Sequence, residues 1–220
     1  MADSKYEGID RRALLRDRRE HRARVAQRLT REAPVAADCL PWAAFDAAPD
    51  WLAWPDDALV LWQRRVGAVF CAPALRRWID TARVTALRSA LGDGFYRSLL
   101  RADDPMAVAT LPVGLPDWPL NGAPSEIAPL LRGCGAAVLV ATLPHGGLRH
   151  AVSQALAPLA ELMMPAAHAQ ALVKRASGLC AGAAVAAVQA CASMPSATAA
   201  DAATAAGAGT EAGTVIGGAA

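Results

Sequence analysis

Histidine side chains can bind metal ions and transfer protons, but the histidines of this chain are not spaced as metal ligands. They are His21, His145, His150 and His168. None stands at a metal-ligand spacing from a cysteine or a carboxylate, and no HExxH motif is present. His145 and His150 flank a Gly-Gly turn, where a loop histidine and a helix-surface histidine are the simplest interpretation. We therefore expect no bound metal and no cofactor.

Five cysteines are spread along the chain, at Cys39, Cys71, Cys134, Cys180 and Cys191. Their odd number, their wide spacing and the lack of a CxxC pair argue against a disulfide framework and against a zinc knuckle. A reducing, cytoplasmic setting fits this pattern best. Cys71 falls on the apolar face of a predicted helix, so we expect a buried and unreactive thiol there.

The sequence contains no recognisable catalytic motif. GxSxG, GxxxxGK[ST] and GxGxxG are all missing, which excludes a standard nucleophile elbow or phosphate loop. Gly92, Asp93 and Gly94 resemble a loop fragment, but the end of one helix and the start of the next explain them. Carboxylates gather at 56–57 and 103–104, beside predicted turns, where helix capping accounts for them. We predict a non-enzymatic protein with no small-molecule substrate.

Arginines dominate the stretch from Asp10 to Arg31, where nine arginines and three acidic residues give a net charge of +6. Because the whole chain carries only +2, the remainder is mildly acidic at −4. Such an arm suits phosphates, an acidic protein surface or anionic lipid headgroups. Asp17 and Glu20 dilute its charge, and no aromatic side chain is available to stack on bases. A solvated or protein-docking helix is therefore favoured over a nucleic-acid binder.

The elements that position these residues are predicted to be helices. Alanine and leucine dominate while isoleucine and aromatics are scarce, so we predict an all-α fold, an irregular bundle of short helices. We divide it into a flexible basic helical arm at 1–36, a helical core domain at 37–176 and a low-complexity Ala/Gly tail at 177–220. Within this tail, alanine favours a partly helical segment from Ala181 to Ala192, and we expect disorder from Ser193 onward. No run reaches the ~18 apolar residues of a spanning helix, and no signal peptide is evident.

The first part of the chain contains many prolines and tryptophans. We expect a helix from Asp10 to about Glu32 that ends before Pro34, because proline disfavours helix in the residue that precedes it. Dense prolines at 38–57 then allow only short turns. We expect the three indoles of that segment to press onto the following bundle, rather than to form a surface binding platform: Trp42, Trp51 and Trp54.

The chain is organised around the stretch from Leu59 to Leu100, where apolar side chains recur at spacings of three and four. Asp56 or Asp57 should cap its first helix, Asp80 or Thr81 the next, and Gly92 should end that one. The predicted core of the stretch is Trp62, Val66, Phe70, Pro73, Leu75, Trp78, Leu87, Leu91, Gly92, Phe95 and Leu99. Ile79 should continue this buried face, with Gln63, Arg64 and Arg65 on the opposite side or at its margin.

A second helical section follows a loop. Four prolines at 110–124 predict a surface loop, which Trp118 would pin down. Beyond it we expect a buried helix from Gly133 to Leu143 and a helix from about Leu148 to Pro165. The latter should be kinked at Pro158, with Leu159 and Leu162 facing inward. A last short helix is predicted over 169–176.

The central stretch resembles the characteristic motif of the SctK family of type III secretion sorting-platform proteins (YscK- and PscK-like proteins). Three pieces carry the resemblance: Ala72–Arg77 with Pro-Ala-Leu-Arg-Arg, Leu87–Gly92 with Leu-Arg-x-Ala-Leu-Gly, and Phe95–Arg101, an aromatic helix ending in arginine. The tryptophan and proline loop at 115–119 and the segment 148–165, ending Leu-Met-Met-Pro, are similar to the family's C-terminal half. The likeness covers roughly residues 57–165 and its composition suggests the Hrp-type branch.

This resemblance implies a cytoplasmic adaptor at the inner-membrane face of an injectisome, a virulence-associated protein transport machine. Its partners would be the SctQ-type pod protein and the cytoplasmic domain of the inner-membrane ring, with membrane contact only through partners. We take Arg64, Arg65, Arg76 and Arg77 as the candidate docking surface of such a scaffold. The alternative is a helical protein whose basic arm binds nucleic acid or an anionic membrane surface.

Overall fold

The computed structural model describes residues 11–101, 123–162 and 164–192. Within these ranges the chain forms ten α-helices and two short 3-10 helices, with no strand. The prediction of an all-α fold is therefore confirmed. The loop around Trp118 and the tail from residue 193 onward, for which we predicted disorder, lie outside the described residues.

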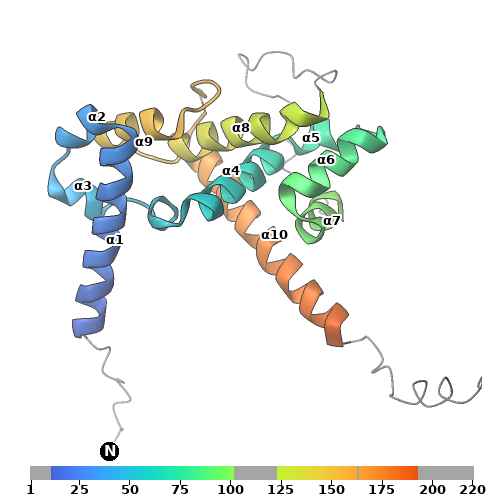
Figure 1. Cartoon of the computed structure of the whole chain (residues 1–220), viewed down its shortest axis with the longest axis horizontal. Coiled ribbons are helices and arrows are strands. Elements are labelled where there is room, and N and C mark those ends of the chain that lie inside the picture. The colour runs from blue at the N-terminus through green and yellow to red at the C-terminus, as the bar shows by residue number, and fades with distance from the viewer. Residues whose placement is uncertain (1–10, 102–122, 163, 193–220) are drawn as a thin grey trace, which may run out of the picture.

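Two central helices, α4 (Asp56–Phe70) and α8 (Ile127–Ala141), form the axis of the molecule and lie against one another in Figure 1. Glycines set their closest approach. A Cβ added to Gly135 would lie 1.7 Å from the Gln63 carbonyl oxygen, and one added to Gly67 would lie 2.0 Å from that of Leu131. Only glycine at both positions allows the two backbones to approach this closely.

One end of the molecule is built from the first third of the chain. It contains α1 (Arg11–Glu32), α2 (Pro34–Asp38), α3 (Trp42–Asp46) and the 3-10 helix η1 (Asp50–Ala53), packed with α9 (Gly147–Leu156). The break at Pro34 is where the sequence predicted it. The C-terminal half of α1 packs into the core, because Val25 and Leu29 are fully buried.

The other end holds the motif that resembles the SctK family. It consists of α5 (Ala72–Leu75), α6 (Thr81–Leu91) and α7 (Asp93–Arg101), next to the 3-10 helix η2 (Pro124–Glu126). The Asp80 carboxylate caps α6 by accepting the backbone N–H groups of Ala82 and Arg83, both at 3.3 Å. Gly92 then ends α6 at φ +83°, a left-handed region that favours glycine. Both boundaries agree with the sequence prediction.

Eight of the eleven residues predicted for the core of the motif are buried: Trp62, Val66, Phe70, Leu75, Leu87, Leu91, Phe95 and Leu99. Pro73 and Trp78 are half-buried, and Gly92 is exposed. Two predicted facings are wrong. Ile79 is 95% exposed because it stands in the turn between α5 and α6, where the helical period no longer applies. Gln63 is 1% exposed rather than on the outer side, because α8 covers this face of α4.

The last described helix, α10 (Ala166–Ala192), joins the two predicted segments, 169–176 and 181–192, in one continuous helix. It packs against α4, α7 and α8. Alanine has the highest helix propensity, so the alanine-rich stretch after Arg175 continues the helix instead of ending it. In Figure 1, its C-terminal end projects away from the body, as does the N-terminal end of α1 at the other side.

The predicted kinked helix over 148–165 is wrong in its second half. Helix α9 ends at Leu156, and Ala157 adopts a left-handed conformation with φ 45°. The chain then turns back onto α8, where the backbone N–H of Leu159 donates to the Gly133 carbonyl oxygen at 3.3 Å. Leu162 is buried as predicted, but Leu159 is exposed. Pro158 therefore follows a helix end rather than producing a kink.

Candidate protein-docking surface

Arg65, one of the four arginines predicted to form a docking surface, is used inside the structure. It is half-buried on α4, and its Nε–H donates to the Leu91 carbonyl oxygen at 3.3 Å. Its Nη1 donates to the Sγ of Cys180 at 3.4 Å, and its guanidinium lies 5.2 Å from the centroid of the Phe95 ring. This side chain therefore connects α4 to α6, α7 and α10.

Arg64 and Arg76 are also half-buried, and Arg77 is exposed. The Nη2 of Arg76 donates to the Leu99 carbonyl oxygen at 3.1 Å. That carbonyl belongs to the last turn of α7, where helical carbonyls lack intrahelical partners and attract cations. Of the predicted set, Arg65 and Arg76 thus make internal contacts, Arg64 is half-buried, and only Arg77 is exposed.

A protruding pair, Arg77 and Ile79, stands in the turn between α5 and α6. Ile79 is among the most exposed large apolar side chains of the described residues, while Trp78 between the two is half-buried. The guanidinium of Arg83 lies 5.7 Å from the Trp78 ring centroid. The periodicity of the sequence missed Ile79, but its position just before the Asp80 cap is a signal that the helix has been interrupted.

The tryptophan segment is divided between core and surface. Trp51 is buried, and Trp54 packs edge-on against Trp62 with ring centroids 5.7 Å apart. Trp42 is 68% exposed and contacts Phe45, and Val35 on the neighbouring α2 is 80% exposed. The expected packing is therefore confirmed for Trp51, whereas Trp42 does not press onto the bundle.

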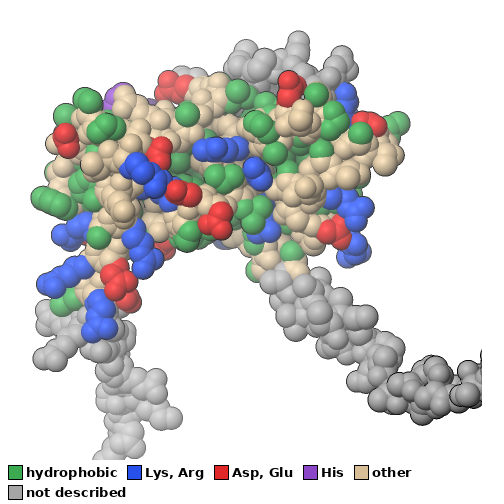
Figure 2. All heavy atoms as spheres, in the orientation of Figure 1, with side chains coloured by type: hydrophobic (Ala, Val, Ile, Leu, Met, Phe, Trp, Pro, Cys, Tyr) green, Lys and Arg blue, Asp and Glu red, His purple; other side chains and the backbone are tan. Residues whose placement is uncertain are grey.

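The arginines of α1 differ along the helix in whether they form ion pairs. Towards its C-terminus they are paired: Arg22 with Asp46, Arg24 with Glu20, and Arg28 and Arg31 with Asp56. Arg16, Arg18 and Arg19 are exposed and have no ion pair among the described side chains. Basic side chains accordingly stand out along the lower part of this helix in Figure 2. A cleft of about 750 Å³ between α1 and the Asp46 to Asp50 segment includes two of them, Arg18 and Arg19.

Asp56 does not cap α4 as the sequence suggested. Pro55 occupies the N-cap position and Asp56 is the first helical residue. Its carboxylate instead accepts from Arg31 Nη2 at 2.9 Å and pairs with Arg28 Nη1 at 2.9 Å. The hydrogen bond from Arg31 lowers the pKa of Asp56 below its ordinary value. The hydrogen bonds of Arg31 to Glu32 and to Asp56 raise the pKa of Arg31 in turn.

The thiols and imidazoles show no catalytic arrangement among the described residues. Cys71 is fully buried at the end of α4, as predicted, and burial raises its pKa well above the ordinary value, so the thiol stays protonated. His150 contacts Gln154 at 3.1 Å on the surface of α9, and His145 is exposed. No group of three histidine, cysteine or acidic side chains could hold a metal ion in the described part of the chain.

None of the described helices is both long enough and apolar enough to cross a bilayer. Comparison with known proteins does not assign this chain to a family. No family model, curated protein or solved structure matches this chain.

Proposed function

We propose that this chain is a non-enzymatic cytoplasmic adaptor of a bacterial type III secretion apparatus, held at the inner-membrane face through its partners. It would link the SctQ-type pod protein to the cytoplasmic domain of the inner-membrane ring. The observation that carries the proposal is the resemblance of the run from Ala72 to Arg101 to the central motif of the SctK family. The all-helical body is consistent with such a role.

Exposure supports a choice of the part of the motif that would meet a partner. Leu87, Leu91, Phe95 and Leu99 are buried and hold α6 and α7 onto the bundle. Arg65 and Arg76 are engaged with backbone carbonyls of the same unit. Arg77 and Ile79 remain outside. Arginine is enriched in binding hot spots, and an exposed isoleucine beside it can fill an apolar pocket of a partner. We therefore place the docking point at the turn between α5 and α6.

Co-purification of the full chain with a pod protein and with the ring's cytoplasmic domain tests this function. Ile79→Asp should weaken binding to one partner by about tenfold or more, because a charge would replace the apolar anchor. Val35→Asp is the matched control, since Val35 is also strongly exposed but lies on α2 at the opposite end. A monodisperse wild-type protein that binds neither partner at mild salt would contradict the adaptor function.

The second candidate is binding of the basic helix to nucleic acid or to an anionic membrane surface, and the unpaired Arg16, Arg18 and Arg19 favour it. Deleting residues 1–33 would be a poor test, because it also removes the buried Val25 and Leu29. Replacing the three exposed arginines by glutamate avoids that problem. Under this candidate function, the variant should lose salt-sensitive binding to duplex DNA or to acidic vesicles. Unchanged retention would exclude it.

A further inference from the structure

A small pocket lies between α1, α4, α8 and α9, away from the turn that holds Arg77 and Ile79. Its volume is about 170 Å³, which is the size of a phosphate group with a few waters and too small for a nucleotide. Three arginines line it, Arg28 and Arg31 from α1 and Arg132 from α8. Leu59, Val60 and Leu156 supply apolar lining.

Gln63 also lines this pocket and is the only buried polar or charged residue in the described part of the chain, at 1% exposure. Its Oε1 accepts from the Nε–H of Arg132 at 3.3 Å, which fixes the orientation of the amide. The other end, Nε2, is buried and has no hydrogen-bond partner among the described residues. A buried donor without an acceptor is costly, and it indicates that an acceptor belongs at this position.

The charges around the pocket leave positive charge uncompensated. Asp56 is occupied by Arg28 and Arg31, and Glu32 by Arg31. Arg132 has no ion pair with a described carboxylate, and its hydrogen bond is to the neutral amide of Gln63. The Nε of Arg28 is also buried without a partner. The unused groups in this pocket are therefore mostly donors.

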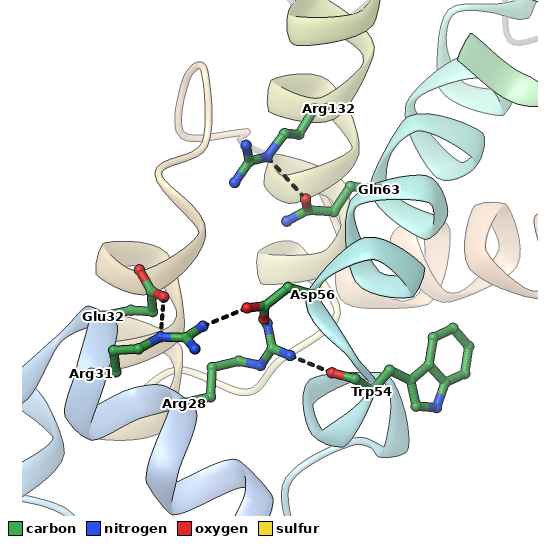
Figure 3. Close-up of polar contacts among 7 residues, drawn as sticks. All are labelled: Arg28, Arg31, Glu32, Trp54, Asp56, Gln63 and Arg132. Carbon is green, nitrogen blue, oxygen red and sulfur yellow. Dashed lines mark hydrogen bonds and ion pairs between the residues drawn. The ribbon is translucent and has the colours of Figure 1, made fainter. Parts of the chain in front are cut away.

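Figure 3 shows how these groups are directed. The Gln63 amide nitrogen and the Arg132 guanidinium point towards the same gap, on the side that faces the Arg31 and Asp56 pair. The arrangement combines an immobile amide donor from a buried side chain with a guanidinium fork, and these are groups that recognise oxyanions. A cation would find no free acceptor on Gln63 and three guanidinium groups around it. The two carboxylates in the lining, Glu32 and Asp56, are already paired with Arg31 and Arg28.

We propose that this pocket binds a phosphate group, either as inorganic phosphate or as the phosphoryl group of a phosphorylated ligand. Phosphate offers three or four acceptor oxygens and nearly two negative charges, and these match the multiple unused donors better than the two oxygens of a carboxylate. Gln63 Nε2 and Arg132 would donate to it, and Arg28 and Arg31 would supply positive charge at the opposite wall. This assignment is independent of the secretion function.

Titration of the full chain with inorganic phosphate, at constant ionic strength in chloride, tests the proposal. We expect saturable binding at one site, a rise of the melting temperature with phosphate concentration, and a shift of the Gln63 side-chain amide signal in nitrogen-15 NMR spectra. Arg132→Gln should weaken binding by about tenfold or more, since it removes the charged donor. Arg132 is exposed, so this variant is expected to fold.

Two controls locate the site. Arg77→Gln removes an exposed arginine outside the pocket and should leave phosphate affinity unchanged. Replacing Arg16, Arg18 and Arg19 by glutamine removes the exposed arginines of α1 and should leave the Gln63 amide shift in place. Equal phosphate affinity in wild type and Arg132→Gln, or a Gln63 signal that does not move, would overturn the proposal and leave a pocket that holds only water.

Separate titrations with O-phosphoserine and with acetate distinguish the sources of the oxyanion. Binding of O-phosphoserine as tight as that of inorganic phosphate supports the site and shows that an esterified phosphoryl group is accepted. Binding of inorganic phosphate alone supports the site for the free ion. Acetate that binds as tightly as phosphate would overturn the assignment of the phosphate group, because two acceptor oxygens would then be sufficient.

Discussion

The two ends of this molecule differ in the arginine contacts that join residues far apart in the sequence. At the end formed by α1 and η1, arginines pair with carboxylates on the surface, as Arg22 does with Asp46. At the end formed by α5 to α7, the ion pairs join near neighbours in the sequence, as Arg88 does with Asp93. The contacts with distant residues are instead made by Arg65 and Arg76, which donate to backbone carbonyls at the ends of helices. Carboxylate partners can be titrated and screened, whereas carbonyl partners cannot. The long-range arginine contacts of the first end are therefore sensitive to salt and pH, whereas those of the second end are fixed by the positions of helix carbonyls.

The crossing of α4 and α8 joins these ends, and a substitution there tests whether they unfold as one unit. Gly135→Ala would place a methyl group 1.7 Å from the Gln63 carbonyl oxygen, so the helices must separate. We expect the largest loss of stability here, in a single denaturant transition and above the ~3–5 kcal/mol of a core truncation, because two helix backbones must move apart. Gly178→Ala on α10 meets nothing within 4 Å and should stabilise by about 0.5–1 kcal/mol. Two separated transitions in the wild type would instead show independent ends.

Packing at the motif end is expected to have the next largest effect. Phe95 is 1% exposed, so Phe95→Ala should lower the free energy of unfolding by about 3–5 kcal/mol. The loss of free energy of unfolding for Trp62→Ala on α4 should fall in the same range. The loss for Trp78→Ala should be smaller, because that indole is half-buried. Ile79→Ala is the matched control, with a change within about 0.5 kcal/mol because the side chain is exposed. A loss at Ile79 comparable to that at Phe95 would contradict the described core.

The contrast between the arginines themselves can be measured directly. Arg65→Gln should cost about 1–3 kcal/mol, because it removes a bond to a carbonyl and the contact with Phe95, and this cost should persist in high salt. Arg22→Gln breaks a surface ion pair and should cost at most about 1 kcal/mol, falling further as salt is added. Urea unfolding at two salt concentrations measures both. Equal salt dependence for the two variants would remove the distinction between the ends.

The smallest effect is expected from the pH dependence at Asp56. Its pKa is lowered in the folded chain by Arg31 and Arg28, so its contribution to stability is present above its pKa in the unfolded chain, about 3.9. As the pH falls below that value and through the lower folded pKa, this contribution is lost. Asp56→Asn should make the free energy of unfolding depend less on pH in this range than it does in the wild type. An unchanged profile would show that the contacts with Arg31 and Arg28 have no net effect.

Much of the helical framework could be predicted from local sequence features. Pro34, Asp80 and Gly92 mark helix boundaries because their effects on backbone dihedrals and terminal N–H groups are local. The buried positions of the motif also followed from spacings of three and four. The length of α10 was predicted only in part, because the sequence indicated two separate helical segments, 169–176 and 181–192, where the structure has one continuous helix.

The candidate docking surface was predicted less well than the fold. The periodicity of α4 placed Gln63 and Arg65 outside, since both are polar, and it placed Ile79 inside, since it is apolar. The hydrophobic periodicity assigns each helix face by the polarity of its residues, and it contains no information on which other helix covers that face. Helix α8 lies over Gln63, while α6, α7 and α10 enclose Arg65. The pocket around Gln63 was missed for the same reason, because its walls come from four separate helices.

The sequence by itself determined that the chain is helical, where most of the helices of its first hundred residues break, and which side chains of the motif can be buried. These outcomes depend on propensity, capping and period, which act over a few residues. Only the tertiary structure decided that Gly67 and Gly135 meet and that Gln63 is buried with a free donor. It also decided that Arg28 and Arg132 line the same pocket as Gln63. Such contacts join residues about 35 to 70 positions apart, and long-range packing, not local pattern, fixes which of them form.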